Sequence, residues 1–175
     1  MFGFRSPSDE PDAIELLKAD HDEVDAMFKE YEALKKNGNA TARKTLVTRI
    51  ANALTVHATM EEEIFYPAAR RVESVEKDLV DEAAVEHQTL KDIIARLQSA
   101  PVSDPLYDAG VKVLGEYTKH HVKEEENERF PQMQKSGADL AELGRRLQAR
   151  KAALEAATGK SKAAAKRANA PAEHA

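Results

Sequence analysis

Apolar residues recur at intervals of three and four along most of the chain, which is the spacing of an amphipathic helix. The first such stretch begins near Ser8 to Pro11, where a polar cap precedes a proline in the first turn. It ends at the turn sequence "NGNA", residues 37–40. Its inward positions are Ile14, Leu17, Val24, Phe28 and Tyr31. The pattern predicts one long helix that buries a single face.

Four further helices follow from the same spacing. The second is predicted over residues 41–70, and the third runs from Ser74 to the segment "APVSDP", residues 100–105. The fifth is predicted over residues 136–157, because Ser136 and Asp139 resemble a capping box. The fourth helix is expected to carry Val113, Leu114, Tyr117 and Phe130.

These elements predict an all-α fold. Short turns between consecutive helices favour an up-down-up-down antiparallel four-helix bundle, which we expect over residues 8–133. The helix at 136–157 would pack on the bundle or extend from it. Residues 158–175 are small, polar and basic, so a disordered tail is expected there.

Composition and charge exclude several classes of function and of metal site. The chain has 175 residues, 42% apolar and 33% charged, and this suits one helical domain. The absence of cysteine excludes disulfides and thiolate metal sites. A net charge of −5 gives no reason to expect nucleic-acid binding, and neither a secretory signal nor a membrane helix is evident. We expect a cytoplasmic monomer or weak homo-oligomer without a membrane partner.

Four histidines interrupt the apolar faces of the helices. Because antiparallel neighbours place residues equidistant from a turn at one height, midpoints between successive histidines locate their levels. These midpoints fall at positions 39, 72 and 104, each inside a predicted turn. Two glutamates follow histidines by one helical turn and share the same faces. The set predicted at one level of the bundle is His21, His57, Glu61, His87, His121 and Glu125.

An internal repeat supports this arrangement. The segments "HATMEEEIFYP" (residues 57–67) and "HVKEEENERFP" (residues 121–131) share a histidine, glutamates four and five residues later, and a proline at the tenth. Each follows a helix with a single inward histidine. The pattern indicates a duplicated helical hairpin with a pseudo-twofold axis between the histidines.

Two carboxylates in an apolar interior require compensation, because an unpaired buried charge costs several kcal/mol. No lysine or arginine is expected on these faces. Two divalent cations would compensate Glu61 and Glu125, each cation taking two histidines while each glutamate bridges both. Imidazole and carboxylate without thiolate favour iron, manganese or zinc over copper. Bridging carboxylates favour two iron ions, with manganese and zinc ranked below.

The chain resembles the hemerythrin-like HHE cation-binding family over about residues 10–133. The motifs that carry the resemblance are "DH" at 20–21, "HATMEEEIFYP" at 57–67, "EH" at 86–87 and "HHVKEEENERFP" at 120–131. The resemblance implies a four-helix bundle with a non-haem di-iron centre that binds or reacts with dioxygen, peroxide or nitric oxide. It implies that one iron is held by His21 and His57 and the other by His87 and His121, with Glu61 and Glu125 bridging.

The sequence departs from the oxygen carriers of this family at two places. The carriers have a second histidine where Lys91 stands, and an aspartate where Glu126 stands. These departures argue against reversible oxygen carriage. The missing histidine favours an enzyme over simple carriage, but the sequence indicates no substrate channel. We therefore expect a module that binds or senses dioxygen, nitric oxide or iron, and keep as an alternative an enzyme that decomposes peroxide or handles nitric oxide. A bundle without metal is the third hypothesis.

Several positions remain open from sequence alone. A shifted register would pair His120 with Glu124 in place of His121 with Glu125. Tyr117 would lie beside the metal or pack, and Tyr66 is assigned to packing. A solvated surface is expected for Glu62, Glu63, Glu124 and Glu126. The basic tail is expected to be a solubilising segment, and nucleic acid or anionic lipid is the alternative contact for Lys160, Lys162, Lys166 and Arg167.

Overall fold

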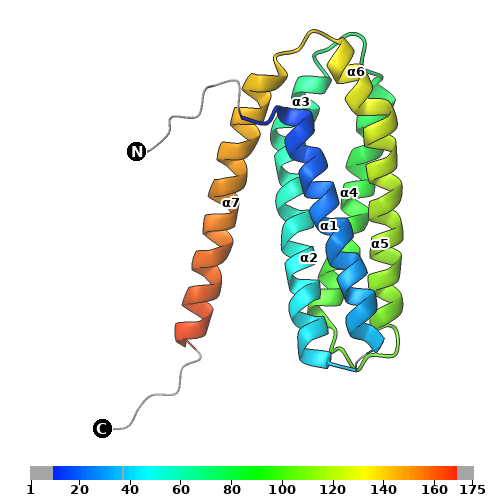
Figure 1. Ribbon diagram of the computed structural model, residues 1–175, viewed down its shortest axis with the longest axis vertical. Helices are drawn as coiled ribbons and strands as arrows, with labels where there is room; N and C mark the ends of the chain where they lie inside the picture. Colours follow the sequence, from blue (N-terminus) through cyan, green and yellow to red (C-terminus); the bar gives the residue numbers. More distant parts are fainter. Residues whose placement is uncertain (1–9, 37, 169–175) are drawn as a thin grey trace.

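The computed structural model describes residues 10–36 and 38–168, which are all-helical without a strand. Four long helices run antiparallel as a bundle, and a fifth leans against one side (Figure 1). This confirms the predicted fold class. No helix in the described part of the chain combines the length and the apolar character that a bilayer crossing demands. The long helices are α1 (Ala13–Lys36), α2 (Ala40–Met60), α4 (Lys77–Ser99), α5 (Tyr107–Glu124) and α7 (Leu140–Ala168).

Two of the bundle helices continue through a π-helical turn into a short α-helix. After α2 come η2 (Glu61–Phe65) and α3 (Tyr66–Ala69), and after α5 come η3 (Glu125–Arg129) and α6 (Phe130–Lys135). The sequence predicted one helix over residues 41–70 and a bend or end at Pro67 and Pro131, but neither π-helical turn. The two interruptions occupy equivalent positions of the internal repeat, so the duplication extends to local backbone geometry.

The helix starts differ from the predicted ones because aspartates act as caps. At α1, Asp12 accepts the Glu15 backbone N–H at 2.9 Å, and Glu15 accepts the Asp12 N–H at 3.0 Å, forming a capping box. The start was predicted near Ser8 to Pro11, of which residues 8 and 9 lie outside the described part of the chain, and the helix begins at Ala13. At α7, Asp139 accepts the Glu142 N–H at 2.9 Å, so the helix begins after Asp139 and not at Ser136.

The last helix is longer than predicted. It continues to Ala168, so residues 158–168, expected to be disordered, are helical. Residues 169–175 lie outside the described part of the chain.

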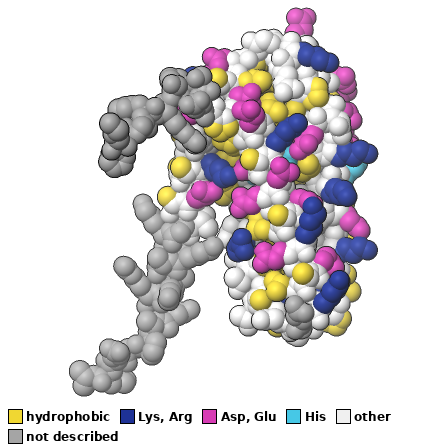
Figure 2. All heavy atoms as spheres, in the orientation of Figure 1, with side chains coloured by type: hydrophobic (Ala, Val, Ile, Leu, Met, Phe, Trp, Pro, Cys, Tyr) yellow, Lys and Arg dark blue, Asp and Glu magenta, His cyan; other side chains and the backbone are white. Residues whose placement is uncertain are grey.

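Acidic and basic side chains intermingle over the visible face of the bundle (Figure 2).

The core consists of two apolar clusters separated along the bundle axis. One lies near the start of α1 and includes Leu17, Met60, Phe65, Phe130 and Leu147. The other lies towards the opposite end and includes Val24, Ile50, Leu54, Leu90 and Leu114. The predicted histidines lie at intermediate positions on the same helices. The bundle thus surrounds a polar layer with apolar packing on both sides.

Helix α7 packs closely against the start of α1 at a glycine. A Cβ atom on Gly144 would lie 2.6 Å from the Pro11 carbonyl oxygen and 2.9 Å from the Ala13 nitrogen. Backbone atoms cannot move aside as a flexible side chain can. The absence of a side chain at Gly144 therefore sets the distance between α7 and the bundle.

We expect Gly144→Ala to lower the free energy of unfolding by about 1–3 kcal/mol, because the added methyl group overpacks a backbone contact. Chemical denaturation of the variant and the parent measures this. Gly110→Ala is the matched control, since its Cβ would meet only the Leu97 side chain, at 3.1 Å. Equal stability of the Gly144→Ala variant and the parent would contradict close docking of α7.

Candidate metal centre

Four histidines from four helices meet in the polar layer, and each is buried. His21 of α1 and His57 of α2 have their Nε2 atoms 3.2 Å apart. His87 of α4 and His121 of α5 have their Nε2 atoms 3.1 Å apart. The structure therefore brings together the predicted histidines at one level, in the two pairs expected from the sequence.

The two glutamates connect the histidine pairs. Glu61 Oε2 lies 3.2 Å from His57 Nε2 and 3.3 Å from His87 Nε2. Glu125 Oε2 lies 3.3 Å from His21 Nε2 and 3.5 Å from His121 Nε2. Each glutamate thus contacts one histidine of each pair, as bridging carboxylates would. Both side chains are fully buried.

Each histidine has a carboxylate on its other ring nitrogen. The Nδ1 atoms of His21 and His87 lie 2.9 Å from Glu126 and 3.0 Å from Glu62. Those of His57 and His121 lie 3.5 Å from Asp20 and 2.7 Å from Glu86. The pairings obey the pseudo-twofold relation. Because an ionised carboxylate only accepts hydrogen bonds, every Nδ1 carries the proton and every neutral ring directs its Nε2 lone pair inward.

The inward atoms fit metal ions. Neutral histidines would place two Nε2 lone pairs face to face at 3.2 Å and 3.1 Å, which is repulsive unless a cation lies between them. Metal–ligand bonds of about 2.0–2.2 Å place neighbouring ligand atoms about 3.0–3.4 Å apart, matching these separations. Glu61 Oε1 and Glu125 Oε2 are buried without a hydrogen-bond partner among the described residues. Glu61 Oε1 is therefore a further available donor, and Glu125 Oε2 is the oxygen that faces His21 and His121.

The donor atoms form two unequal groups. One consists of His21, His57, Glu61 and Glu125, and the other of Glu61, His87 and His121. Lys91, at the position where the carriers have a histidine, instead binds Glu62 with its Nζ 2.6 Å and 2.7 Å from the two carboxylate oxygens. Glu125 Oε2 also lies 3.5 Å from His121 Nε2, so the second half differs from the first in this longer contact and lacks the extra histidine of the carriers.

The π-helical turns bring Tyr66 to the centre, a position that the sequence assigned to packing. In η2 the Tyr66 N–H donates to the Glu61 carbonyl, five residues back, and η3 repeats this between Phe130 and Glu125. The wider turn rotates Tyr66 onto the face of Glu61. Its hydroxyl donates to Glu125 Oε1 at 3.0 Å and lies 3.3 Å from His87 Nε2. A 3.6-residue period cannot predict this position.

A buried arginine also contacts the centre. The Arg129 guanidinium donates to the Leu79 carbonyl at 2.9 Å and to the His121 carbonyl at 3.3 Å, and lies 3.6 Å from Glu125. The expectation that no basic residue lies on the inward faces is therefore wrong. Arg129 follows Glu125 by one helical turn. Continuing the inward positions of the fourth helix by four residues would therefore have predicted that Arg129 faces the interior.

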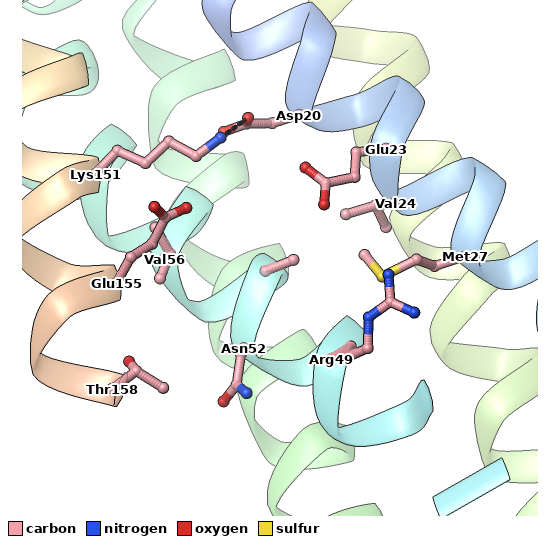
Figure 3. Close-up of a pocket in the computed structure, with 11 residues that line it drawn as sticks. Asp20, Glu23, Val24, Met27, Arg49, Asn52, Val56, Lys151, Glu155 and Thr158 are labelled. Carbon is pink, nitrogen blue, oxygen red and sulfur yellow. Dashed lines mark hydrogen bonds and ion pairs between the residues drawn. The ribbon is translucent and has the colours of Figure 1, made fainter. Parts of the chain in front are cut away.

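Lysines compensate two of the outer carboxylates. Lys151 of α7 forms an ion pair with Asp20, whereas Lys91 binds Glu62 (Figure 3 shows Lys151). With Arg129, three basic groups face six carboxylates, leaving an excess of negative charge that favours cations. The six carboxylates are those of Asp20, Glu61, Glu62, Glu86, Glu125 and Glu126.

The excess negative charge also acts on the histidines. Burial lowers the pKa of His57, but attraction to the Glu61 carboxylate outweighs this and raises the pKa to about 10. The pKa of His87 is raised for the same reason. In the absence of metal, protons therefore supply the positive charge that the carboxylates require.

The structure decides the register of α5. His121 and Glu125 lie in the interior, whereas His120 is 60% exposed. Tyr117 is 41% exposed and does not lie beside the centre, since Thr118 occupies the inward position. The four glutamates expected on a solvated surface differ in their exposure and contacts. Glu62 and Glu126 are half-buried against histidines, Glu124 is partly buried, and Glu63 forms a surface ion pair with Arg150.

The sequence profile of the hemerythrin HHE cation-binding domain matches residues 12–133. The chain belongs to this family. This HHE domain is similar in fold to an HHE cation-binding domain-containing protein from Mycobacterium kansasii, with a TM-score of 0.70 and 24% identity over 84% of this chain and 89% of the other. A DNA nickase from Nostoc sp. is 26% identical over 118 residues, which are 66% of this chain. Those residues span 32% of the nickase, about a third of its length.

The inner and outer carboxylates should differ in their effect on metal binding. We expect Glu61→Gln and Glu125→Gln each to abolish metal binding, because each removes a carboxylate that contacts both histidine pairs. Glu62→Gln and Glu126→Gln should lower affinity about 10–100-fold, since they only orient histidines. Equilibrium dialysis against a low concentration of ferrous iron, followed by elemental analysis, measures this.

The matched control is Glu63→Gln, which makes the same charge change at the surface ion pair with Arg150. It should bind metal with the affinity of the parent. Parent-like affinity in the Glu62→Gln and Glu126→Gln variants would show that their contacts with the histidines do not support the centre.

Metal removal should lower the melting temperature, and the difference should grow as pH rises. The pKa of His57 is about 10 in the metal-free fold against an ordinary value of 6.5. Protonation therefore stabilises that fold fully below pH 6.5, and the contribution is lost as pH rises towards 10. Metal binds the deprotonated imidazole and removes this loss. Thermal unfolding of metal-loaded and chelated protein near pH 6.5 and near pH 10 tests this. An equal difference in melting temperature at the two pH values would contradict it.

Proposed function

We propose that this protein holds two iron ions and uses them to bind a small oxygen or nitrogen species, dioxygen or nitric oxide. The observation that carries this proposal is the pair of histidine sets bridged by Glu61 and Glu125. Imidazole and carboxylate donors without thiolate suit iron, and manganese or zinc would fit the same donors less specifically. Bound iron would supply the coordination and electron exchange that such small molecules require.

The absence of the carriers' second third-helix histidine supports an open position for an external molecule on the side of His87 and His121. Lys91 stands at that position, and its Nζ is engaged by Glu62. Tyr66 lies on this side, with its hydroxyl 3.3 Å from His87 Nε2. Burial raises the pKa of Tyr66 well above its ordinary value, so the phenol stays protonated and can donate a hydrogen bond.

A small apolar cavity adjoins the four histidines. Its volume is about 20 Å³, and its apolar lining includes Val24, Leu54, Leu90 and Ile94. A space slightly larger than the minimum for one water, about 10–15 Å³, excludes all but very small molecules. The cavity therefore supports a diatomic ligand or peroxide over a larger organic substrate.

Peroxide decomposition is the second candidate, and Tyr66 is the observation that favours it. A protonated phenol 3.0 Å from Glu125 and next to the open position can hold or transfer a proton during cleavage of an oxygen–oxygen bond. Simple carriage of a gas does not require such a donor. An enzyme would therefore use Tyr66, whereas a binding module would tolerate its loss.

Nucleic acid is not part of the proposal. The segment shared with the nickase is a third of that protein. The net charge of −5 and the mixed surface in Figure 2 do not favour a phosphate backbone, whose binding depends on concentrated basic residues.

The test is anaerobic loading with ferrous iron, followed by separate exposure to dioxygen, nitric oxide and peroxide. A binding module should show a change in the visible spectrum with one of the gases that reverses when the gas is removed. An enzyme should consume many equivalents of peroxide per chain. No spectral response to any of the three molecules would overturn the proposal.

Two tyrosine variants separate the candidates. If the protein decomposes peroxide, Tyr66→Phe should retain both ions but slow the reaction by about tenfold or more, because one donor is lost. Tyr117→Phe removes a hydroxyl from an exposed side chain of α5 and should have no effect. Equal peroxide rates in both variants would exclude a role for the buried phenol.

A further inference from the structure

A second group of metal-binding side chains lies outside the centre, on the surface between α4 and α5. It consists of Glu86, His120 and Glu124, whose potential ligand atoms all lie within 4.8 Å of one another. His120 Nε2 is 3.0 Å from Glu124 Oε1 and 3.7 Å from Glu86 Oε1. Because His120 is 60% exposed, this group opens to solvent.

The carboxylates of this group are not fully compensated. Glu124 Oε2 is buried, and the described part of the chain provides it with no hydrogen-bond partner. Glu86 is 8% exposed, and its Oε2 atom accepts from His121 Nδ1 at 2.7 Å, which leaves Oε1 directed towards His120. Arg129 lies 3.9 Å from Oε2, on the inner side. Two carboxylates therefore converge on one imidazole, which could neutralise at most one of them.

Comparison of the two halves of the repeat shows what is missing at this position. Asp20 is the equivalent of Glu86, and its outer oxygen pairs with Lys151 of α7. Figure 1 shows α7 leaning on α1 and α2, away from the α4–α5 side. Where the second half has His120 and Glu124, the first half has the buried apolar residues Val56 and Met60. The uncovered half thus presents donors in place of an apolar contact and a lysine.

We propose that Glu86, His120 and Glu124 form an outer site for a divalent first-row metal ion, such as zinc or ferrous iron. One imidazole nitrogen and two carboxylate oxygens are a donor set for these ions and leave further positions to water. The ion supplies the positive charge that Lys151 supplies in the other half. Exposure makes this site weaker and faster to exchange than the buried centre.

The outer site shares Glu86 with the interior. One oxygen of Glu86 orients His121, and the other faces the outer ion. An ion at the surface therefore restrains the carboxylate that positions an interior histidine. The outer ion and the interior centre are therefore linked through one carboxylate, and the outer site adds a third ion to the two of the proposed function.

Calorimetric titration of the full chain with zinc, a redox-inert probe, tests the outer site. The parent should bind two ions tightly and a third more weakly. His120→Ala and Glu124→Gln should each lose the third ion and retain the tight pair. Glu116→Gln is the matched control, because it removes a carboxylate one turn earlier on the same helix, where Glu116 pairs with the exposed Lys112. It should bind all three ions.

A combined Glu61→Gln and Glu125→Gln variant makes the test independent of the interior centre. It should bind a single zinc ion with the affinity of the third ion in the parent, and Glu124→Gln added to it should abolish that binding. Thermal unfolding confirms that each variant is folded. Saturation of the parent at two ions, or a third ion that survives both His120→Ala and Glu124→Gln, overturns the proposal.

Discussion

The fold depends on how two fully buried carboxylates are compensated. Glu61 and Glu125 lie in the middle of an otherwise apolar bundle, and an ionised carboxylate there costs several kcal/mol unless opposite charge is near. The four histidines supply that charge either as imidazolium groups or as ligands of cations. Every other feature of the layer follows from this need. The outer carboxylates fix the ring tautomers, and the basic residues prevent the accumulated negative charge from opposing folding.

Periodicity predicted the six central residues because a helix repeats its faces every 3.6 residues and short turns fix the relative heights of antiparallel neighbours. The level of His21, His57, His87 and His121 needed no knowledge of side-chain contacts. Errors of one position were still possible, and Tyr117 illustrates this. The apolar spacing of the fourth helix includes Tyr117, whereas Thr118 faces inward in the structure.

The remaining residues escaped prediction for distinct physical reasons. Tyr66 reaches the centre only because the backbone widens into a π-helical turn. Contacts of Glu62 with His87 and of Glu126 with His21 join neighbouring helices, so they depend on side-chain rotamers and helix distances. Arg129 follows Glu125 by one helical turn, but an arginine is rarely buried unless it is paired, and its partners come from the tertiary structure. Lys151 belongs to a helix whose docking site the local pattern does not specify.

The ion pair between Lys151 and Asp20 shows that a residue beyond the family-matched segment contributes to the centre. The match to the family stops at residue 133, yet Lys151 reaches back from α7 to the carboxylate that faces His57. Mutations in α7, outside the four-helix bundle, are therefore expected to change the properties of the centre. Proteins that share the bundle but carry a different C-terminal helix would have the same inner donors. The basicity of their histidines would differ, because the charge beside the outer carboxylate would differ. Substitutions outside residues 12–133 would then be enough to alter the chemistry inside the bundle.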